Sequence, residues 1–193
     1  MRRPRRARNV RDLNEDELQP AKPLDPEKAR TRTLQRAVKL LAAKPRSVAE
    51  LRERLLEKPW ASAEAVEAAL AKLQEYGYLN DEQFALGYAA SRVRQKPIGR
   101  QRLARDLQMK KLPREAAEQA LAQVYEEMPE EKLIEQAIAK RVRLRGRPTN
   151  RQESKSLFDH LLRRGFNYDL VINKVRALSA TDFDENEATH ESE

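Results

Sequence analysis

The sequence predicts an all-α fold, in which three tandem three-helix repeats form an elongated, curved, solenoid-like molecule with disordered termini. One apolar spacing occurs three times, each time across a helix, a turn and a second helix, starting at positions 51, 103 and 157. A period of about 50 residues is typical of repeat proteins, whose units bury their apolar faces against one another. No segment alternates polar and apolar residues with period two, and β-branched residues are sparse, so no sheet is expected.

The three copies align position by position. The second and third copies have identical intervals, and the first copy has one extra residue after Trp60. The aligned apolar residues are Leu51, Leu55, Trp60, Val66, Leu70 and Leu73; Leu103, Leu107, Leu112, Ala117, Leu121 and Val124; and Leu157, Leu161, Phe166, Val171, Val175 and Leu178. The alignment makes Trp60, Leu112 and Phe166 equivalent, and it predicts that each fills the turn between two helices in the core.

The first repeat is expected at residues 28–78, after a basic arm at 1–27. Its first helix should begin at Pro26 or Glu27, because Asp25 is a good N-cap and proline suits a first turn. Ser47 and Glu50 have the spacing of a capping box for the second helix. The other predicted landmarks are the apolar stripe Leu34, Val38 and Leu41, the third N-cap Ser62, and the helix ends at Pro45, Pro59 and Gly77.

The second and third repeats are expected at residues 79–128 and 129–179. The second should hold helices from Asp81 to before Pro97, from about 100 to 110 and from 113 to 128, with Phe84, Tyr88 and Val93 on the apolar face of the first. The third should hold a long helix that Gly146 breaks, a helix around Leu157 that ends at Gly165, and a helix over about 168–178. An acidic tail is expected at 180–193.

Charge dominates the composition of this 193-residue chain, of which 36% is charged. The net charge is +8. The six arginines of residues 1–11 balance the six acids of the tail, so the body between them carries the excess, which favours polyanionic partners. No apolar run is long enough to cross a membrane, and no apolar segment follows the basic N-terminus as in a secretory signal. With no cysteine, we expect a cytoplasmic protein without disulfides or thiolate chemistry.

The sequence offers no catalytic constellation. There is no glycine-rich phosphate loop and no Ser–His–Asp signature. The two histidines, His160 and His190, have no second imidazole at metal-ligand spacing, and His160 is interpreted as a helix-face residue. We therefore expect neither an enzyme nor a metal or other cofactor.

Two basic clusters are candidate binding sites. The middle cluster comprises Arg92, Arg94, Lys96, Arg100, Arg102, Arg105, Lys110 and Lys111. The distal cluster comprises Lys140, Arg141, Arg143, Arg145, Arg147 and Arg151, with no acid between its first and last members. Clustered arginines bind phosphates or carboxylates through bidentate contacts. The alternatives are a solvated charged face, or pairing within the chain, for example of Arg102 with Asp106.

Several segments resemble a known family. Residues 77–85 read GYLNDEQFA, 99–107 read GRQRLARDL and 47–55 read SVAELRERL. These strings resemble the GYLDD-x-x-FA, G-x-x-R-[IL]-x-x-E-L and RS-x-x-EL-x-x-KL segments of RecX proteins, the bacterial regulators of RecA recombinase. The resemblance covers about residues 30–178. It departs from the pattern at Asn80, where an acid is common, and at Asp106, where Glu is usual, and it is looser in the last repeat.

The resemblance implies three tandem three-helix repeats and no catalysis. It implies binding to the RecA nucleoprotein filament, with suppression of filament growth, ATPase, strand exchange and co-protease activity. The partners would be the RecA filament and, more weakly and mainly through charge, single- or double-stranded DNA. We expect a monomer with no membrane association. A stand-alone DNA-binding protein remains the alternative, because the second and third helices of each repeat also suit a helix-turn-helix.

Overall fold

A computed structural model describes residues 25–179, and the predicted arm and tail lie almost wholly outside this range. The described chain is entirely helical, which confirms the predicted fold class. Its nine helices are α1 (Pro26–Ala43), α2 (Val48–Leu56), α3 (Ala63–Glu75), α4 (Asp81–Gln95), α5 (Arg100–Met109), α6 (Arg114–Glu127), α7 (Glu130–Arg145), α8 (Arg151–Arg163) and α9 (Tyr168–Leu178). Helix α1 begins at Pro26, one of the two predicted starts, so its first two residues fall within the expected arm at 1–27.

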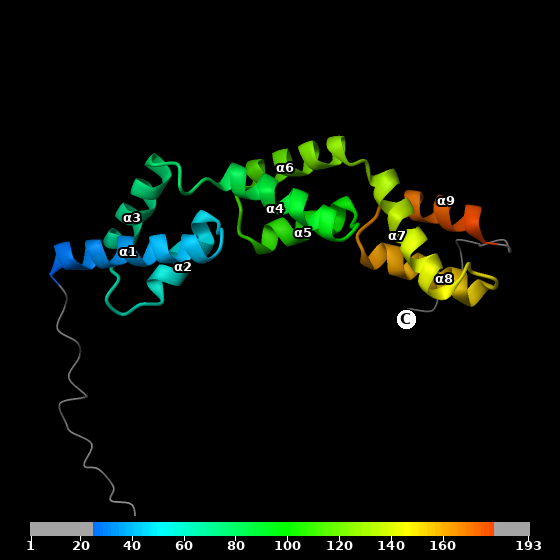
Figure 1. The fold of residues 1–193 in the computed structure, drawn as a ribbon, viewed down its shortest axis with the longest axis horizontal. Helices are drawn as coiled ribbons and strands as arrows, with labels where there is room; N and C mark the ends of the chain where they lie inside the picture. The colour runs from blue at the N-terminus through cyan, green and yellow to red at the C-terminus, as the bar shows by residue number, and fades with distance from the viewer. Residues whose placement is uncertain (1–24, 180–193) are drawn as a thin grey trace, which may run out of the picture.

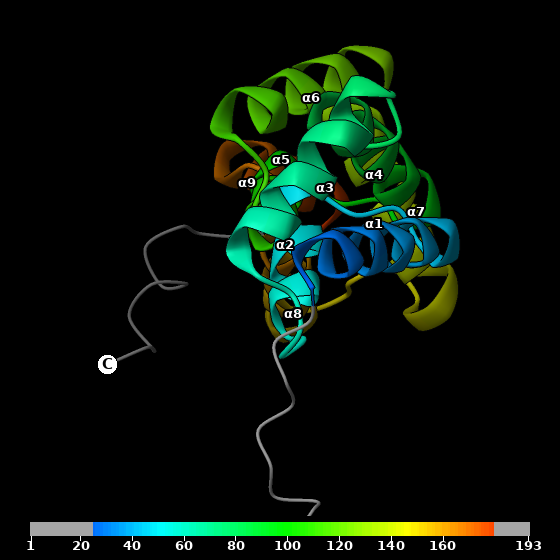
Figure 2. The same cartoon turned by 90° about the vertical axis from the view of Figure 1, so that its left-hand side faces the viewer.

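The helices pack in three successive groups of three: α1–α3, α4–α6 and α7–α9. These groups lie in a row along the long axis of the molecule, and the row bends so that its middle stands above its two ends (Figure 1). Viewed from the α1 end, the groups lie one behind another (Figure 2). The second helices of the groups, α2, α5 and α8, line the lower side of the row (Figure 1).

Local sequence signals set the ends of the helices. The Asp25 carboxylate accepts from the Glu27 N–H at the start of α1. Ser47 and Glu50 form the predicted capping box of α2. Gly77, Gly146 and Gly165 follow helix ends with positive φ values, a conformation that glycine adopts without steric cost. These capping predictions are confirmed.

Two of the predicted apolar stripes are wrong in detail. Val38 is 49% exposed, and α1 instead buries Ala29, Thr33 and Ala37. In the same way, α4 buries Ala85, Ala89 and Val93, and leaves Phe84 and Tyr88 only partly buried. Small side chains let α1 approach α3, and α4 approach α6, more closely than large ones would. The alanine face is therefore the inner face, although the larger residues carry the stronger hydrophobic signal.

The three aligned turn positions are not equally buried. Phe166 is 1% exposed and packs in the core. Leu112 and Trp60 are partly buried, and the Trp60 ring instead lies under the Arg32 guanidinium, 4.5 Å from its centroid. The three residues occupy equivalent turns of the fold, as predicted, but they are not equally buried.

The described residues form two hydrophobic cores rather than three. The first repeat has its own core around Leu51, Leu55 and Leu70. The second and third repeats share one continuous core, which runs from Ala85 on α4 to Val175 on α9. The distal two repeats therefore form one packed unit, to which the first repeat is joined mainly by polar contacts.

Candidate functional site

A hydrogen bond between equivalent positions joins each pair of neighbouring repeats, although its donor differs. The carbonyl oxygen of Lys110 accepts from Ser47 Oγ at 2.7 Å, and the carbonyl oxygen of Arg164 accepts from the Gly99 N–H at 2.9 Å. Ser47 and Gly99 are the N-caps of α2 and α5. Each repeat thus contacts the start of the second helix of the repeat before it, and the second helices lie along one side of the molecule (Figure 1).

Much of the middle cluster is paired within the chain. Asp106, on α5, is largely buried, with a side chain 12% exposed. It accepts from Arg92 on α4 at 2.6 Å and from Arg102 at 3.1 Å. The hydrogen bond to Asp106 is the main cause that raises the pKa of Arg92. Intrachain pairing, the alternative considered for Arg102, is what the structure shows.

Lys110 and Lys111 hold the first repeat to the second. Lys110 Nζ lies 2.8 Å from Glu50 Oε1 and 5.6 Å from the centroid of the Tyr88 ring. Lys111 pairs with Glu53 on α2. Lys110 is also only about one-fifth exposed, so it contributes more to the joint between repeats than to an open surface.

Arg100 packs at the joint between the second and third repeats. Its guanidinium lies 5.2 Å from the centroid of the Tyr125 ring, and its backbone N–H donates to Glu130 at the start of α7. The Tyr125 hydroxyl donates to the Ile98 carbonyl at 2.9 Å, and burial raises the pKa of this phenol. Arg94 and Arg105 complete the middle cluster; both are exposed and, within residues 25–179, neither lies within 4 Å of a carboxylate.

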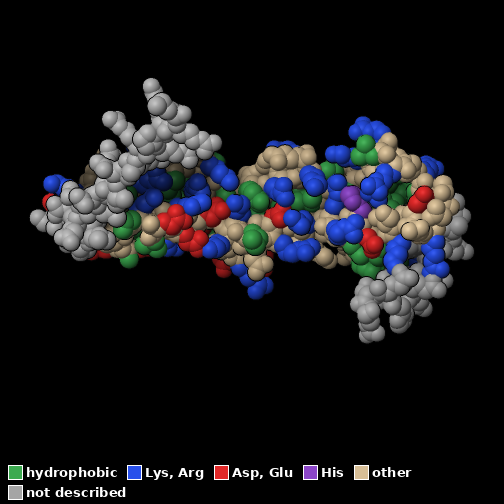
Figure 3. All heavy atoms as spheres, turned by 90° about the horizontal axis from the view of Figure 1, so that it is seen from below, with side chains coloured by type: hydrophobic (Ala, Val, Ile, Leu, Met, Phe, Trp, Pro, Cys, Tyr) green, Lys and Arg blue, Asp and Glu red, His purple; other side chains and the backbone are tan. Residues whose placement is uncertain are grey.

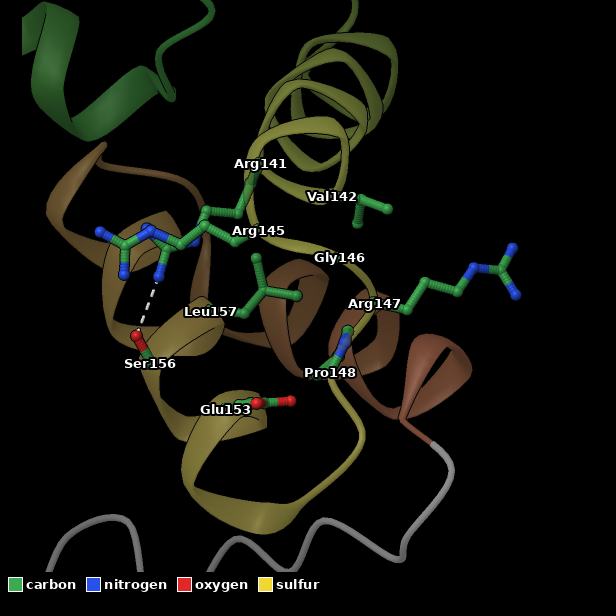
Figure 4. Close-up of a pocket in the computed structure, with 9 residues that line it drawn as sticks. All are labelled: Arg141, Val142, Arg145, Gly146, Arg147, Pro148, Glu153, Ser156 and Leu157. Carbon is green, nitrogen blue, oxygen red and sulfur yellow. Dashed lines mark hydrogen bonds between the residues drawn. The ribbon is translucent and has the colours of Figure 1, made fainter.

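The distal cluster divides over two sides of α7. A cleft of about 160 Å³ lies between the end of α7 and the start of α8. The Arg141 and Arg145 side chains run side by side on one side of it, and Arg147 points away on the other (Figure 4). Arg141 donates to Ser156 Oγ at 2.9 Å. Glu153 stays with the helix start, where it accepts from the N–H and hydroxyl of Thr149.

Lys140 and Arg143 are exposed on α7. Arg151, the first residue of α8, has an interaction partner. The six predicted residues therefore do not form one surface. Arg141 and Arg145 lie side by side, whereas Arg147 lies on the other side of the cleft (Figure 4).

A different grouping emerges where α8 ends against the second repeat. We call it the junction cluster: Lys96, Arg141, Arg145, His160, Arg163 and Arg164. Burial, and then the charges of Arg164, Arg141, Arg163 and Lys96, lower the pKa of His160 to about 4. Burial, Arg145 and Arg163 lower the pKa of Arg141. These cations come from three elements, and several of them act on His160 and Arg141.

Sequence reasoning missed His160, Arg163 and Arg164 as members of this cluster. The repeat alignment holds a signal for Arg164, because it occupies the position of Lys110 in the second repeat, 54 residues earlier. No linear signal links His160 to Lys96, because only the contact between repeats brings α8 beside the end of α4. Within residues 25–179, no group of acidic or histidine side chains has the arrangement of a metal site, and no helix is long and apolar enough to span a membrane.

Comparison with known proteins identifies the family. A relative from Chlorobaculum tepidum, named regulatory protein RecX, is 33% identical over 144 residues, which cover 74% of this chain and 86% of the relative. The chain belongs to the RecX family. The RecX of Pelodictyon phaeoclathratiforme is 29% identical over 151 residues, covering 78% of this chain and 91% of that one.

The RecX domain assignments follow the helices. Residues 34–73 match the first three-helix domain of RecX, and residues 80–121 match the second. The crystal structure of RecX from Lactobacillus salivarius superposes with a TM-score of 0.69 at 18% identity, covering 79% of this chain and 97% of that one. At this identity the superposition shows the fold alone.

Proposed function

We propose that this chain is a non-catalytic regulator that binds the RecA nucleoprotein filament and restrains it. The activities restrained would be filament assembly, ATPase, strand exchange and co-protease activity, in recombination, DNA repair and the SOS response. Membership of the RecX family supports this proposal, since its relatives are named regulatory proteins. We further propose that it acts in the cytoplasm as a monomer of three repeats, at about residues 28–78, 79–128 and 129–179.

The observation that carries the proposal is the charge on one side of an elongated molecule. Lys and Arg side chains gather on the underside, over the second and third repeats, and acidic side chains lie nearer the first (Figure 3). A row of repeats presents a long surface rather than a closed pocket. Such a surface suits a polymer that combines protein subunits with a nucleic-acid strand, because successive repeats can contact successive elements of the polymer.

Exposed cations of the middle and distal clusters are the proposed contacts. Arg94 and Arg105 are the strongest candidates in the middle cluster, because no described carboxylate neutralises them. Arg92 and Arg102 share Asp106, and we propose that they shape the surface rather than provide its free charge. In the distal cluster, the candidates are the exposed Lys140, Arg143, Arg145 and Arg147, and Arg145 lies beside the half-buried Arg141.

RecA ATPase activity at fixed single-stranded DNA and fixed salt tests the proposal. The parent protein should lower the steady-state rate, and the variant Arg94→Glu/Arg105→Glu should lower it much less. The matched control Arg36→Glu/Lys39→Glu reverses two exposed cations on α1 and should act like the parent. A parent protein without effect on the ATPase would refute the proposal.

A stand-alone helical DNA-binding protein is the second candidate. The unpaired cations of the junction cluster favour it, since they need only a polyanion and no RecA. The two functions separate in the same assay: a stand-alone binder would retain DNA but leave the ATPase unchanged once DNA is in excess over both proteins.

A further inference from the structure

The junction cluster differs from the paired part of the middle cluster in having no neutralising carboxylate. Around Arg92 and Arg102, Asp106 supplies a carboxylate, and around Lys110 and Lys111, Glu50 and Glu53 do so. Within residues 25–179, no carboxylate lies within 4 Å of the cations of the junction cluster. Like charges held together without a counter-charge create a positive potential that attracts anions.

The framework beneath the cluster is rigid. The Arg164 guanidinium donates to the Pro97 carbonyl at 3.0 Å, which places it one residue from Lys96. The Gly99 N–H donates to the Arg164 carbonyl, and the Gln101 N–H donates to the Gly165 carbonyl at 3.1 Å. The cations are therefore gathered by backbone contacts between two repeats that share a core, and the folded chain holds them together although they repel.

The spacing of the side chains suits a ligand with several separate anionic groups. Arg141 and Arg145 are four residues apart, about 6 Å along α7, and extend in the same direction (Figure 4). Arg141 is oriented by its bond to Ser156, and Arg163 and Lys96 are exposed. Arginine, lysine and histidine all donate to phosphate oxygens, so the cluster offers donors from three elements of the fold to a chain of phosphates.

A protein surface fits this cluster less well than nucleic acid does. Cores of protein–protein interfaces are depleted of charge and enriched in aromatic residues, whereas protein–nucleic acid interfaces are polar and strongly positive. The junction cluster consists of cations and one imidazole. It carries no phenyl, phenol or indole ring on which a base could stack, so contacts mainly to the phosphate backbone, without sequence preference, are expected.

We propose that the junction cluster is the DNA-contacting site of the molecule, and that it binds the phosphates of a single strand across the joint between the second and third repeats. This deepens the proposed function, since it assigns the nucleic-acid contact of a nucleoprotein filament to one place. Bound phosphates offset the repulsion around His160 and favour its protonated form. Binding is therefore coupled to uptake of a proton.

Fluorescence anisotropy of a labelled oligothymidylate, measured with the full chain and without RecA, tests the site. Each phosphate contact to a single strand contributes about 0.7 to the slope of log K against log salt. The variant Arg141→Ala/Arg145→Ala should therefore reduce the slope between about 50 and 200 mM salt by about 1.4. The control Arg36→Ala/Lys39→Ala removes the same charge from α1 and should leave the slope within about 0.3 of the parent's.

A second measurement tests the predicted proton uptake through the pH dependence of binding. Between pH 7.5 and 5.5, the parent should gain several-fold more affinity for the oligothymidylate than His160→Gln does. The proposal is overturned if the parent does not bind the oligothymidylate, if both double variants change the slope equally, or if His160→Gln keeps the full pH response. RecA is absent from these measurements, so a parent that binds through the cluster but leaves the ATPase unchanged would refute only the proposed function.

Discussion

The Gly99 N–H donates to the carbonyl oxygen of Arg164, and this hydrogen bond brings two backbone segments from different repeats into direct contact. A Cβ on Gly99 would lie 2.1 Å from the Gly165 carbonyl oxygen, and a Cβ on Gly165 would lie 2.3 Å from the Arg102 nitrogen. Two glycines thus permit the approach that builds the shared core, and with it the junction cluster.

Replacing either glycine should loosen this joint. Gly99→Ala forces backbone to move, and Gly165→Ala adds the strain of an L residue at φ +79°. We expect each to lower the free energy of unfolding by about 2–4 kcal/mol, as overpacking and backbone strain do. Thermal or urea unfolding followed by circular dichroism measures this.

Gly87→Ala is the matched control for this pair. Gly87 lies within α4, with nothing within 4 Å of its added Cβ. Alanine should therefore stabilise the helix by about 0.5–1 kcal/mol. A Gly99→Ala protein as stable as the parent would contradict the close packing of the two repeats.

Ser47 should matter more than an ordinary helix cap. Its hydroxyl accepts from the Glu50 N–H at 3.1 Å and donates to the Lys110 carbonyl, so Ser47→Ala removes a cap and a bond between repeats. The expected loss of stability is about 2 kcal/mol, against about 1 kcal/mol for Ser62→Ala, which caps α3 at an exposed position. Equal losses in chemical denaturation would show that the bond to Lys110 adds nothing.

The aligned turn positions should respond unequally to truncation. Phe166→Ala empties a fully buried site in the shared core and should cost about 3–5 kcal/mol. Leu112→Ala should cost less, on the order of 1–2 kcal/mol, because Leu112 is partly exposed. Urea unfolding of the two variants compares their losses of stability. A smaller loss for Phe166→Ala than for Leu112→Ala would contradict the prediction.

Stability should fall in mild acid because of His160. Its pKa is about 4 in the folded chain and near 6.5 when unfolded, so between these values the unfolded chain binds a proton that the folded chain does not. The stability that the neutral His160 gives the folded chain is fully present above pH 6.5 and is lost as the pH falls toward 4. Solvent screening of this partly exposed ring limits the loss to about 1–2 kcal/mol.

His160→Gln isolates this effect from the carboxylates that titrate in the same range. The difference in unfolding free energy between parent and variant should change with pH from 6.5 to about 4. A constant difference would mean that neither burial nor the cations of the junction cluster lower the pKa of the ring.

The sequence by itself determined the helices and their grouping. Their ends follow from local chemistry: the Ser47–Glu50 capping box, Asp25 before Pro26, and glycines where φ is positive each act within a few residues. The apolar spacing indicated three units because it recurs with nearly the same intervals from positions 51, 103 and 157. The helix caps depend on neighbouring residues, and the repeat appears when the sequence is aligned with itself. Both can therefore be found without the structure.

The tertiary structure decided which faces are inner and which charges are free. Ala37 and Ala85 are buried in place of Val38 and Phe84, because the fit between two helices depends on both surfaces at once. Of the arginines on α4 and α5, those that meet Asp106 are neutralised, and His160 lies among cations because α8 docks against the end of α4. The electrostatic potential at a site depends on the distances between charges in the folded molecule, not on their order in the sequence. The proposed functional surface therefore appears only when the repeats are packed together.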